Sequence, residues 1–456
     1  MGNLSFITRL QLWFEPYRDR RMLTLLALGF SSGLPAPLVF SNLSIWLRDE
    51  GVSRTDIGLF ALAATPYAIN FLWAPLIDRL RLPWLTARFG RRRGWALMTQ
   101  SLLMVAIVLL SFTSPSDGLW LMAAAVLFVT FISATQDIVI DAYRIEILDL
   151  NQYGSGSAAG IWGWHLGGTL IGGAGGLYLA EAFGWNAAYL LLSVGVLIGM
   201  FAVLMSPEPN VAPPEDTLAE EERAIALLER WTFLPEVPRR IMGWIYLTIL
   251  APLFEFTRRN GWLLILIFIF VFKLGDALLG RMSGVFYREL GFSLSEIAEV
   301  AKVYGLTANL VGIVIGGILV AKIGILKALF ISGFATAATN LTYSWLAVSG
   351  QSTGVFIFAV ASDNFTTGLV TVALVAYLSS LCNSAYTATQ YALLASLANL
   401  ARIWFSATSG MMVDSLDGDW ALFFLLCAGI ALIGLPLLMV IMRKYPIERL
   451  ASEKQS

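Results

Sequence analysis

Long apolar stretches separated by short polar segments run through nearly the whole chain. A helix needs about 20 mainly apolar residues to cross a bilayer, and twelve stretches meet that length. The pattern therefore predicts an all-α polytopic membrane protein with twelve transmembrane helices. The expected ranges are 22–46, 57–77, 93–114, 119–143, 157–181, 186–206, 261–286, 296–321, 325–348, 354–380, 386–412 and 418–442.

The longest polar segment, 207–260, divides these stretches into two groups of six. Inside it, residues 241–254 are uncharged but too short to cross the membrane comfortably, and a crossing there would invert every later helix. This piece is predicted to be an amphipathic helix in the membrane interface. The expected parts are an N-terminal segment 1–21, a bundle 22–206, a linker 207–260, a second bundle 261–442 and a tail 443–456.

Lysine and arginine gather in alternate loops. The loop after the second stretch holds six arginines, whereas the loops on the other side hold only Arg48, Arg54 and Arg288. Because loops rich in Lys and Arg stay in the cytoplasm, both termini and the linker are predicted to be cytoplasmic.

Composition also indicates a membrane protein. The chain is 57% hydrophobic and only 13% charged, against about 25% charged in soluble domains. Its net charge of −1 suggests no nucleic-acid partner, and Cys382 and Cys427 form neither a disulfide framework nor a metal motif. The N-terminus is too polar for a signal peptide, so the first apolar stretch is expected to remain as a membrane helix. The sequence shows no nucleophile motif, metal cluster or cofactor motif that would indicate an enzyme.

A repeated loop pattern relates the two groups of six. APLIDRL followed by FGRRRGW lies after the second stretch, and GGILVAKIGILKAL lies at the matching point after the eighth. The pattern resembles the loop signature of the major facilitator superfamily, whose halves are related by an axis along the membrane normal. The second copy lacks the acidic residue and has Ala321 and Lys322 there.

Charges deep in the membrane mark a candidate site. Such a charge costs about 2.5–3.5 kcal/mol on insertion scales and must face water or protein. At ~1.5 Å per residue, Lys273 and Asp276 lie nearest the midplane, three residues apart on one helix face. They are either a self-neutralising structural pair or a functional one; the second is favoured because an apolar pair would be cheaper there. The other polar residues expected to line the cavity are Asn70, His165, Asn309, Asp363, Asn364, Gln390 and Arg402.

The stretch ATQDIVIDAYRIE places Asp137, Asp141 and Arg144 on one helix face. Asp137 lies ~9 Å past the midplane and Asp141 about 15 Å past it. Asp137 is therefore expected to face the cavity, whereas Asp141 and Arg144 are expected to form a cytoplasmic gate. The other predicted gate residues are Asp78, Arg79, Arg91 and Arg92. The glycines of 167–176 predict close helix packing rather than a phosphate loop.

Several stretches, in the same order along the chain, resemble the AmpG-type muropeptide permeases of Gram-negative bacteria. They are LGFSSGLPAPLVFSNLSIWL, FLWAPLIDR, FGRRRGWALMTQ, SATQDIVIDAYR, FKLGDALLG, YGLTANLVGIVIGGIL and CNSAYTATQYALLASLANLAR. The resemblance implies the major facilitator fold and an inner-membrane location. It also implies proton-driven import of N-acetylglucosaminyl-1,6-anhydro-N-acetylmuramyl peptides for peptidoglycan recycling and β-lactamase induction. The matching motif positions are Asp137, Asp141, Lys273, Asp276, Asn383, Gln390 and Arg402.

Two departures bear on the cargo. Asn70 and His165 stand where better-known relatives have Lys and Arg, so the cavity is expected to be less basic. Family members can also carry two further helices. The mechanism expected is that Lys273 and Arg402 bind carboxylates, while Asn309, Asn364 and Gln390 bind amides and hydroxyls. Asp276 and Asp137 are the expected proton-coupling acids.

Other readings stay open at this point. A permease of the same family with another amphiphilic cargo, such as a metallophore or an acetyl-CoA-like molecule, fits the same pattern. A membrane-embedded sensor or enzyme fits it poorly. The expected partners are a small amphiphilic glycopeptide, protons and the lipid bilayer, with the chain a monomer and with no metal or cofactor.

Overall fold

The computed structural model describes residues 15–52, 60–115, 118–209, 222, 226 and 251–445, although some side chains inside helices, including that of Arg402, lie outside the description. All regular elements among these residues are helices. The first half contains η1 (Glu15–Tyr17), α2 (Arg20–Gly33), α3 (Pro35–Val39), α4 (Ser41–Asp49), η2 (Ala61–Ala64), α6 (Thr65–Ile69), η3 (Asn70–Leu72), α7 (Ala74–Arg79), α8 (Leu85–Phe89), α9 (Arg91–Ser111), α10 (Leu119–Ile147), η5 (Leu150–Gln152), α11 (Tyr153–Trp164), η6 (His165–Gly175), α12 (Gly176–Phe183), α13 (Trp185–Ser193) and α14 (Val196–Met205).

The second half begins after the linker, most of which lies outside the described residues, as does 241–250 of the predicted interfacial helix. Its elements are α17 (Ala251–Thr257), α18 (Trp262–Phe272), α19 (Leu274–Glu289), α20 (Leu294–Glu299), η8 (Val300–Gly305), α21 (Leu306–Ile323), α22 (Ile325–Ser349), α23 (Thr353–Leu381), α24 (Thr387–Ser415) and α25 (Trp420–Lys444). The limits of the predicted domains stay predictions.

The all-α membrane fold predicted from the hydrophobic pattern is confirmed. Within the described ranges, nine helices are long and apolar enough to cross a membrane. Three predicted stretches are helical without being among the nine. The stretch 57–77 is divided into short pieces, two of which carry a proline (Pro66 and Pro75) near the start, where a missing N–H is tolerated. The stretch 157–181 contains the π-helix η6, and α24 contains positions outside the description.

Glycines let α11 and η6 approach α2 and α3 at backbone distance. A Cβ added at Gly163 would overlap the carbonyl oxygen of Leu26, and one at Gly167 would overlap that of Phe30. Small residues at such contacts are how membrane helices pack closely without a hydrophobic driving force. The predicted packing role of the glycines in 167–176 is therefore confirmed for Gly167.

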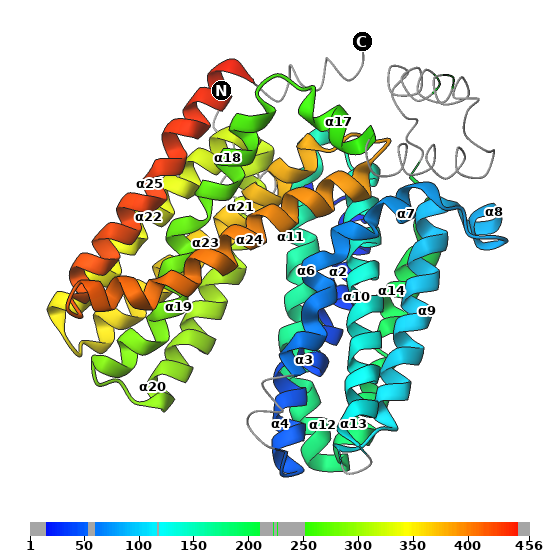
Figure 1. Ribbon diagram of the computed structural model, residues 1–456, viewed down its shortest axis with the longest axis horizontal. Coiled ribbons are helices and arrows are strands. Elements are labelled where there is room, and N and C mark those ends of the chain that lie inside the picture. Colours follow the sequence, from blue (N-terminus) through cyan, green and yellow to red (C-terminus); the bar gives the residue numbers. More distant parts are fainter. Residues whose placement is uncertain are drawn as a thin grey trace, which may run out of the picture.

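The two halves have separate cores on one side of the molecule and shared cores on the other. One separate core contains Trp46 and Tyr189 of the first half, and the other contains Tyr343 and Phe424 of the second. On the side where α2 begins and α25 ends (Figure 1), Ile145 of α10 packs among helices of the second half. We call this side the termini side. The halves meet there, and Figure 1 shows α24 crossing toward the first half.

Replacing Gly163 with alanine is expected to lower the free energy of unfolding by about 1–3 kcal/mol, because the added methyl group overpacks the contact with α2. Thermal unfolding of the purified protein in detergent measures this change. The control is Gly354→Ala in α23, where a Cβ meets nothing within 4 Å, and where a change within about 0.5 kcal/mol is expected. Equal shifts for both variants would contradict the packing account.

Candidate functional site

The deepest predicted ion pair is present at a break between two helices. Lys273 ends α18 and Asp276 lies in the first turn of α19, with Nζ 3.3 Å from Oδ2 and side chains 17% and 22% exposed. Asp363 of α23 is close enough to interact electrostatically with both groups. It also accepts a hydrogen bond of 3.3 Å from the hydroxyl of Tyr343. Two carboxylates thus stand near one lysine.

The predicted asparagines of the second half join α21 to α23. The amide nitrogen of Asn309 donates to the carbonyl oxygen of Asn364 at 3.0 Å, and the amide nitrogen of Asn364 donates to Val360 O at 2.9 Å. Asn309 thus connects α21 to α23, the helix that also carries Asp363. Arg402 belongs to α24, but its side chain lies outside the description.

A cavity of about 290 Å³ lies between the halves, and we call it the Asp137 cavity. Asp137 Oδ1 accepts a 2.7 Å hydrogen bond from Ser32 Oγ at its wall. Only Val375 and Tyr391 come from the second half. The lining residues are Leu25, Gly29, Ser32, Asp137, Ile140, Asp141, Arg144, Ser157, Gly160, Ile161, Trp164, Val375 and Tyr391.

Asp141 and Arg144 form their own pair in the wall of this cavity. Arg144 Nη2 lies 2.9 Å from Asp141 Oδ1, and Nη1 donates to Ser157 Oγ at 3.0 Å. The guanidinium also lies over the ring of Tyr391, 5.2 Å from its centre. The side chain of Arg144 is 7% exposed, and its buried Nε–H has no hydrogen-bond partner in the part of the chain that the structure describes.

Two further predicted residues lie near this cavity. Asn70 lines a small adjoining cavity of about 50 Å³ together with Asp141 and Tyr391. His165 Nδ1 lies 3.3 Å from Thr169 Oγ1, and its ring packs edge-on against Trp164. His165 thus contacts a residue of the cavity wall rather than a charged partner.

A buried group of polar contacts between the halves centres on Asp78, at the termini side. Asp78 Oδ1 lies 2.7 Å from Arg92 Nη2, and both side chains are 1% exposed. Across the interface, Asp78 accepts hydrogen bonds from Ala388 N (3.2 Å), Thr389 N (2.9 Å) and Thr389 Oγ1 (2.8 Å). Glu146 accepts from Arg92 Nε at 3.0 Å. We call Asp78, Arg92, Glu146 and Thr389 the Asp78 cluster.

Each charge in the Asp78 cluster faces an opposite charge, and Glu146 also lies 3.6 Å from Arg91 Nη2. Arg92 Nη1 has no hydrogen-bond partner among the described residues. The first turn of α24 presents free N–H groups and the positive end of the helix dipole to Asp78, an arrangement worth about 0.3–1 kcal/mol or more when buried. Removing one partner of a buried ion pair typically costs about 3–5 kcal/mol, because the other charge is left without compensation. The cluster therefore holds the two halves together in this conformation.

The predicted grouping of charges differs from the observed one. Asp78 forms an ion pair with Arg92, which also pairs with Glu146, and Asp78 accepts hydrogen bonds from α24. Asp141 and Arg144 form a separate ion pair beside the cavity. Arg79 lies over the ring of Tyr386, 5.3 Å from its centre, and Arg91 Nη1 donates to Asp78 O at 3.0 Å. Sequence reasoning missed Glu146 and Thr389, and a weak signal for Glu146 was its place in the same charged stretch as Asp141.

Gln390 is held by the linker-end helix α17. Its Oε1 accepts from Asn383 N at 2.7 Å and from Arg259 Nη2 at 3.3 Å. Its Nε2 donates to Pro252 O at 3.2 Å and to Glu255 Oε2. Because protein groups already use both ends of the amide, its role in cargo binding stays a prediction. The motif residues Asn383 and Gln390 here connect α17 to the loop before α24.

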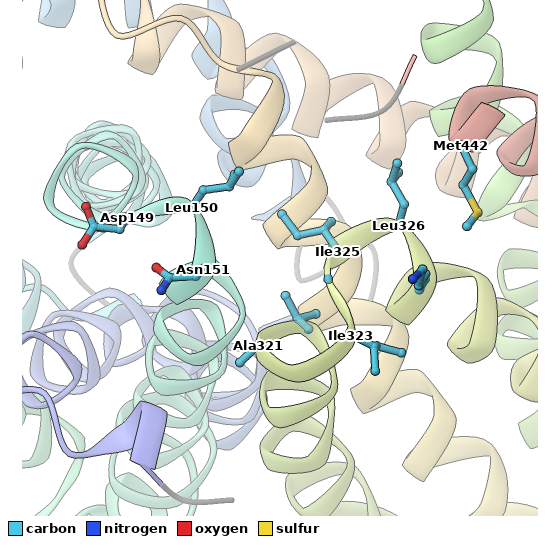
Figure 2. A pocket seen from close by; sticks show the side chains of 11 residues that line it. Asp149, Leu150, Asn151, Ala321, Ile323, Ile325, Leu326 and Met442 are labelled. Carbon is cyan, nitrogen blue, oxygen red and sulfur yellow. The ribbon is translucent and has the colours of Figure 1, made fainter. Parts of the chain in front are cut away.

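A further cavity lies away from the charged pairs described above. Figure 2 shows it between the loop of Asp149, Leu150 and Asn151 and the loop after α21, with Met442 at one edge. Its volume is about 570 Å³. Because it lies between loops of the two halves at the termini side, it is part of their contact there rather than of the central site.

Comparisons with known proteins agree with this architecture. Residues 22–406 match the sequence profile described as "Major Facilitator Superfamily". The chain belongs to the major facilitator superfamily. It is 35% identical over 426 residues to the anhydromuropeptide permease of Escherichia coli, covering 93% of this chain and 80% of the relative. It is 33% identical to AmpG 4 of Rickettsia felis, covering 94% of this chain and 98% of the relative. Within the superfamily it therefore belongs to the AmpG-type permeases.

Solved structures of the superfamily share the fold. The fucose:proton symporter FucP of Escherichia coli superposes with a TM-score of 0.63 at 11% identity, covering 91% of this chain and 98% of that one. The proton:xylose symporter XylE gives 0.60 at 14% identity, covering 93% and 94%. The chain is thus a multi-pass membrane transporter of this superfamily.

Replacing Thr389 with valine removes one of the hydrogen bonds that cross from α24 to Asp78, worth about 1 kcal/mol. Opening of the termini side should therefore become about fivefold more populated. The native Cys382 reports it, because its side chain is 6% exposed and near Arg144 and Tyr153 of the other half. The measurement is the rate of Cys382 alkylation in a Cys427→Ala background.

The matched control is Thr371→Val in α23, since the Thr371 hydroxyl bonds only to Thr367 O of its own helix among its described contacts. Its alkylation rate is expected to equal that of the background protein. If Thr389→Val and Thr371→Val react at the same rate, the Asp78 cluster does not hold the halves together.

Proposed function

We propose that the protein imports anhydro-muropeptides, with or without a stem peptide, from the periplasm into the cytoplasm of a Gram-negative bacterium. The observation that carries the proposal is the 35% identity to a relative named anhydromuropeptide permease, which extends over 93% of this chain. The imported fragments then enter peptidoglycan recycling and act in β-lactamase induction. A monomer in the inner membrane suffices, since both halves of the fold come from one chain.

The termini side is the cytoplasmic side in this proposal. It carries the arginine-rich loop after α7 and the described chain ends, and such loops stay in the cytoplasm. The structure is then the conformation closed toward the cytoplasm. The Asp78 cluster is the gate, with Arg79 and Arg91 at its edge, and the Asp141–Arg144 pair lies next to it on the cavity side.

Cargo carboxylates bind on the second half in this proposal. Lys273 supplies one cation near the middle of the membrane, and Arg402 of α24 is expected to supply another. Charge-assisted hydrogen bonds from such groups are about twice as strong as neutral ones. Asn309 and Asn364 lie on the neighbouring helix pair and supply amides for sugar or peptide groups.

Proton coupling is assigned to Asp276. Its ion pair with Lys273 spans 3.3 Å, so protonation of the carboxyl frees the lysine for a cargo carboxylate. Asp363 lies near the same pair, but its carboxylate accepts a hydrogen bond from Tyr343. Because Asp276 forms the ion pair with Lys273, we assign the neutralisation of Lys273 to Asp276. A coupling role for Asp137 stays a prediction.

Accumulation of labelled anhydro-disaccharide tripeptide in proteoliposomes with an acidic exterior tests the proposal. The wild type should concentrate the cargo, and a protonophore should abolish the accumulation. Asp276→Asn should lose gradient-driven accumulation by about tenfold or more, while exchange of internal for external cargo continues. The matched control is Glu181→Gln, an exposed carboxylate in α12, with wild-type accumulation expected.

Two results would count against separate parts of the proposal. If the wild type does not take up the glycopeptide but takes up a metallophore or an acetyl-CoA-like molecule, the cargo is wrong and the alternative permease applies. If Asp276→Asn retains full proton-driven accumulation, the cargo stands and the coupling role of Asp276 is wrong.

A further inference from the structure

The Asp137 cavity holds polar groups that the proposed coupling mechanism does not use. Asp137 accepts one described hydrogen bond, from Ser32. A carboxylate has two oxygens and about four acceptor positions, so Asp137, which lines the cavity, can accept further hydrogen bonds. Among the side chains that the structure describes, none forms an ion pair with Asp137.

An unused donor lies in the same cavity wall. The side chain of Arg144 is 93% buried, since its exposed fraction is 7%. Asp141 and Ser157 bind its two terminal nitrogens, but its Nε–H has no hydrogen-bond partner among the described residues. A buried donor without an acceptor costs about 1–3 kcal/mol or more for a charged group. The Nε atom has almost no exposed surface in this conformation, so a ligand oxygen that reaches it when the cavity wall moves would remove that cost.

An aromatic ring completes the wall. Trp164 lines the cavity and is 40% exposed. The ring of His165 packs edge-on against its indole ring. The cavity volume of about 290 Å³ is at the lower end of small-molecule sites, which span about 300–1,000 Å³. It has room for one ring with its substituents rather than for a complete glycopeptide.

The three features together fit one chemical class. A pyranose ring has hydroxyls that both donate and accept, which matches a free carboxylate acceptor and a free guanidinium donor. Its C–H face is apolar and packs on an indole ring. A simple ammonium ion fits less well, because it offers no acceptor to the Arg144 Nε–H. An isolated carboxylate fits less well, because Asp137 would repel it.

We propose that the Asp137 cavity is a saccharide subsite that binds one sugar ring of the cargo. The inference rests on the proposed function and adds an orientation to it. The sugar end contacts Asp137, Arg144 and Trp164 of the first half, and the carboxylate end contacts Lys273 of the second half. The cargo thereby bridges the two halves, which couples its binding to their relative movement.

Competition binding to the full chain in detergent, without a proton gradient, tests the subsite separately from coupling. The labelled probe is the anhydro-disaccharide tripeptide. The two competitors are the anhydro-disaccharide without peptide and the free stem tripeptide. Asp137→Asn and Trp164→Ala should each weaken the disaccharide by about tenfold or more, while the free tripeptide changes by less than twofold.

Two further variants guard against a general loss of structure. Trp164→Phe keeps an aromatic face and should recover most of the disaccharide binding. Tyr178→Ala truncates a 75% exposed aromatic side chain of α12, away from the cavity, and should bind both competitors like the wild type.

The outcomes separate the subsite from the proposed function. If the wild type binds neither the glycopeptide nor the disaccharide, the proposed function fails and the subsite fails with it. If the wild type binds both, but Asp137→Asn and Trp164→Ala leave disaccharide binding unchanged, only the subsite is wrong. If these variants weaken the free tripeptide instead, the cavity holds the peptide end, and the saccharide assignment is overturned.

Discussion

A buried aspartate of α7 that faces the first turn of α24 is the constraint on which this conformation depends. Asp78 is 4% exposed, and an ionised carboxylate can be removed from water only when ion pairs and hydrogen bonds replace its hydration. Arg92 supplies the ion pair from the same half, but three of the hydrogen bonds come from the first turn of α24 in the other half. The halves cannot separate at the termini side without exposing or orphaning this charge.

The contacts around Asp78 position the rest of the site. Thr389 and Tyr391 lie two residues apart in the first turns of α24, so the segment that binds Asp78 also places the ring of Tyr391 against Arg144. On its other face, Gln390 is bound by Glu255 and Arg259 beside the end of the linker. One helical turn therefore connects the gate, the wall of the Asp137 cavity and the linker-end helix α17. Movement of α24 changes all three together.

Local spacing predicted the local parts of this arrangement. Lys273 and Asp276, like Asp141 and Arg144, are three residues apart on a helix, and both pairs form. The partners of Asp78 were beyond such reasoning, because Thr389 lies 311 positions away in the chain and backbone N–H groups carry no residue signature. The partners of Gln390 were not predictable for the same reason. An amide side chain suits cargo binding, but its partners in α17 lie about 135 residues away in the chain. Helical stretches were predictable from hydrophobicity, whereas the breaks around Asn70 and the π-helix η6 depend on packing against neighbours.

Distances between spin labels on the two faces test most directly whether the halves alternate about this contact. One pair, at Leu150 and Lys327, spans the termini side, where Figure 2 shows the two loops facing each other. A second pair, at Glu50 and Glu289, spans the opposite side. The account predicts that cargo at acidic pH lengthens the first distance while it shortens the second, and that Asp78→Asn lengthens the first without cargo. An unchanged first distance under all these conditions, or both distances moving in the same direction, would contradict it.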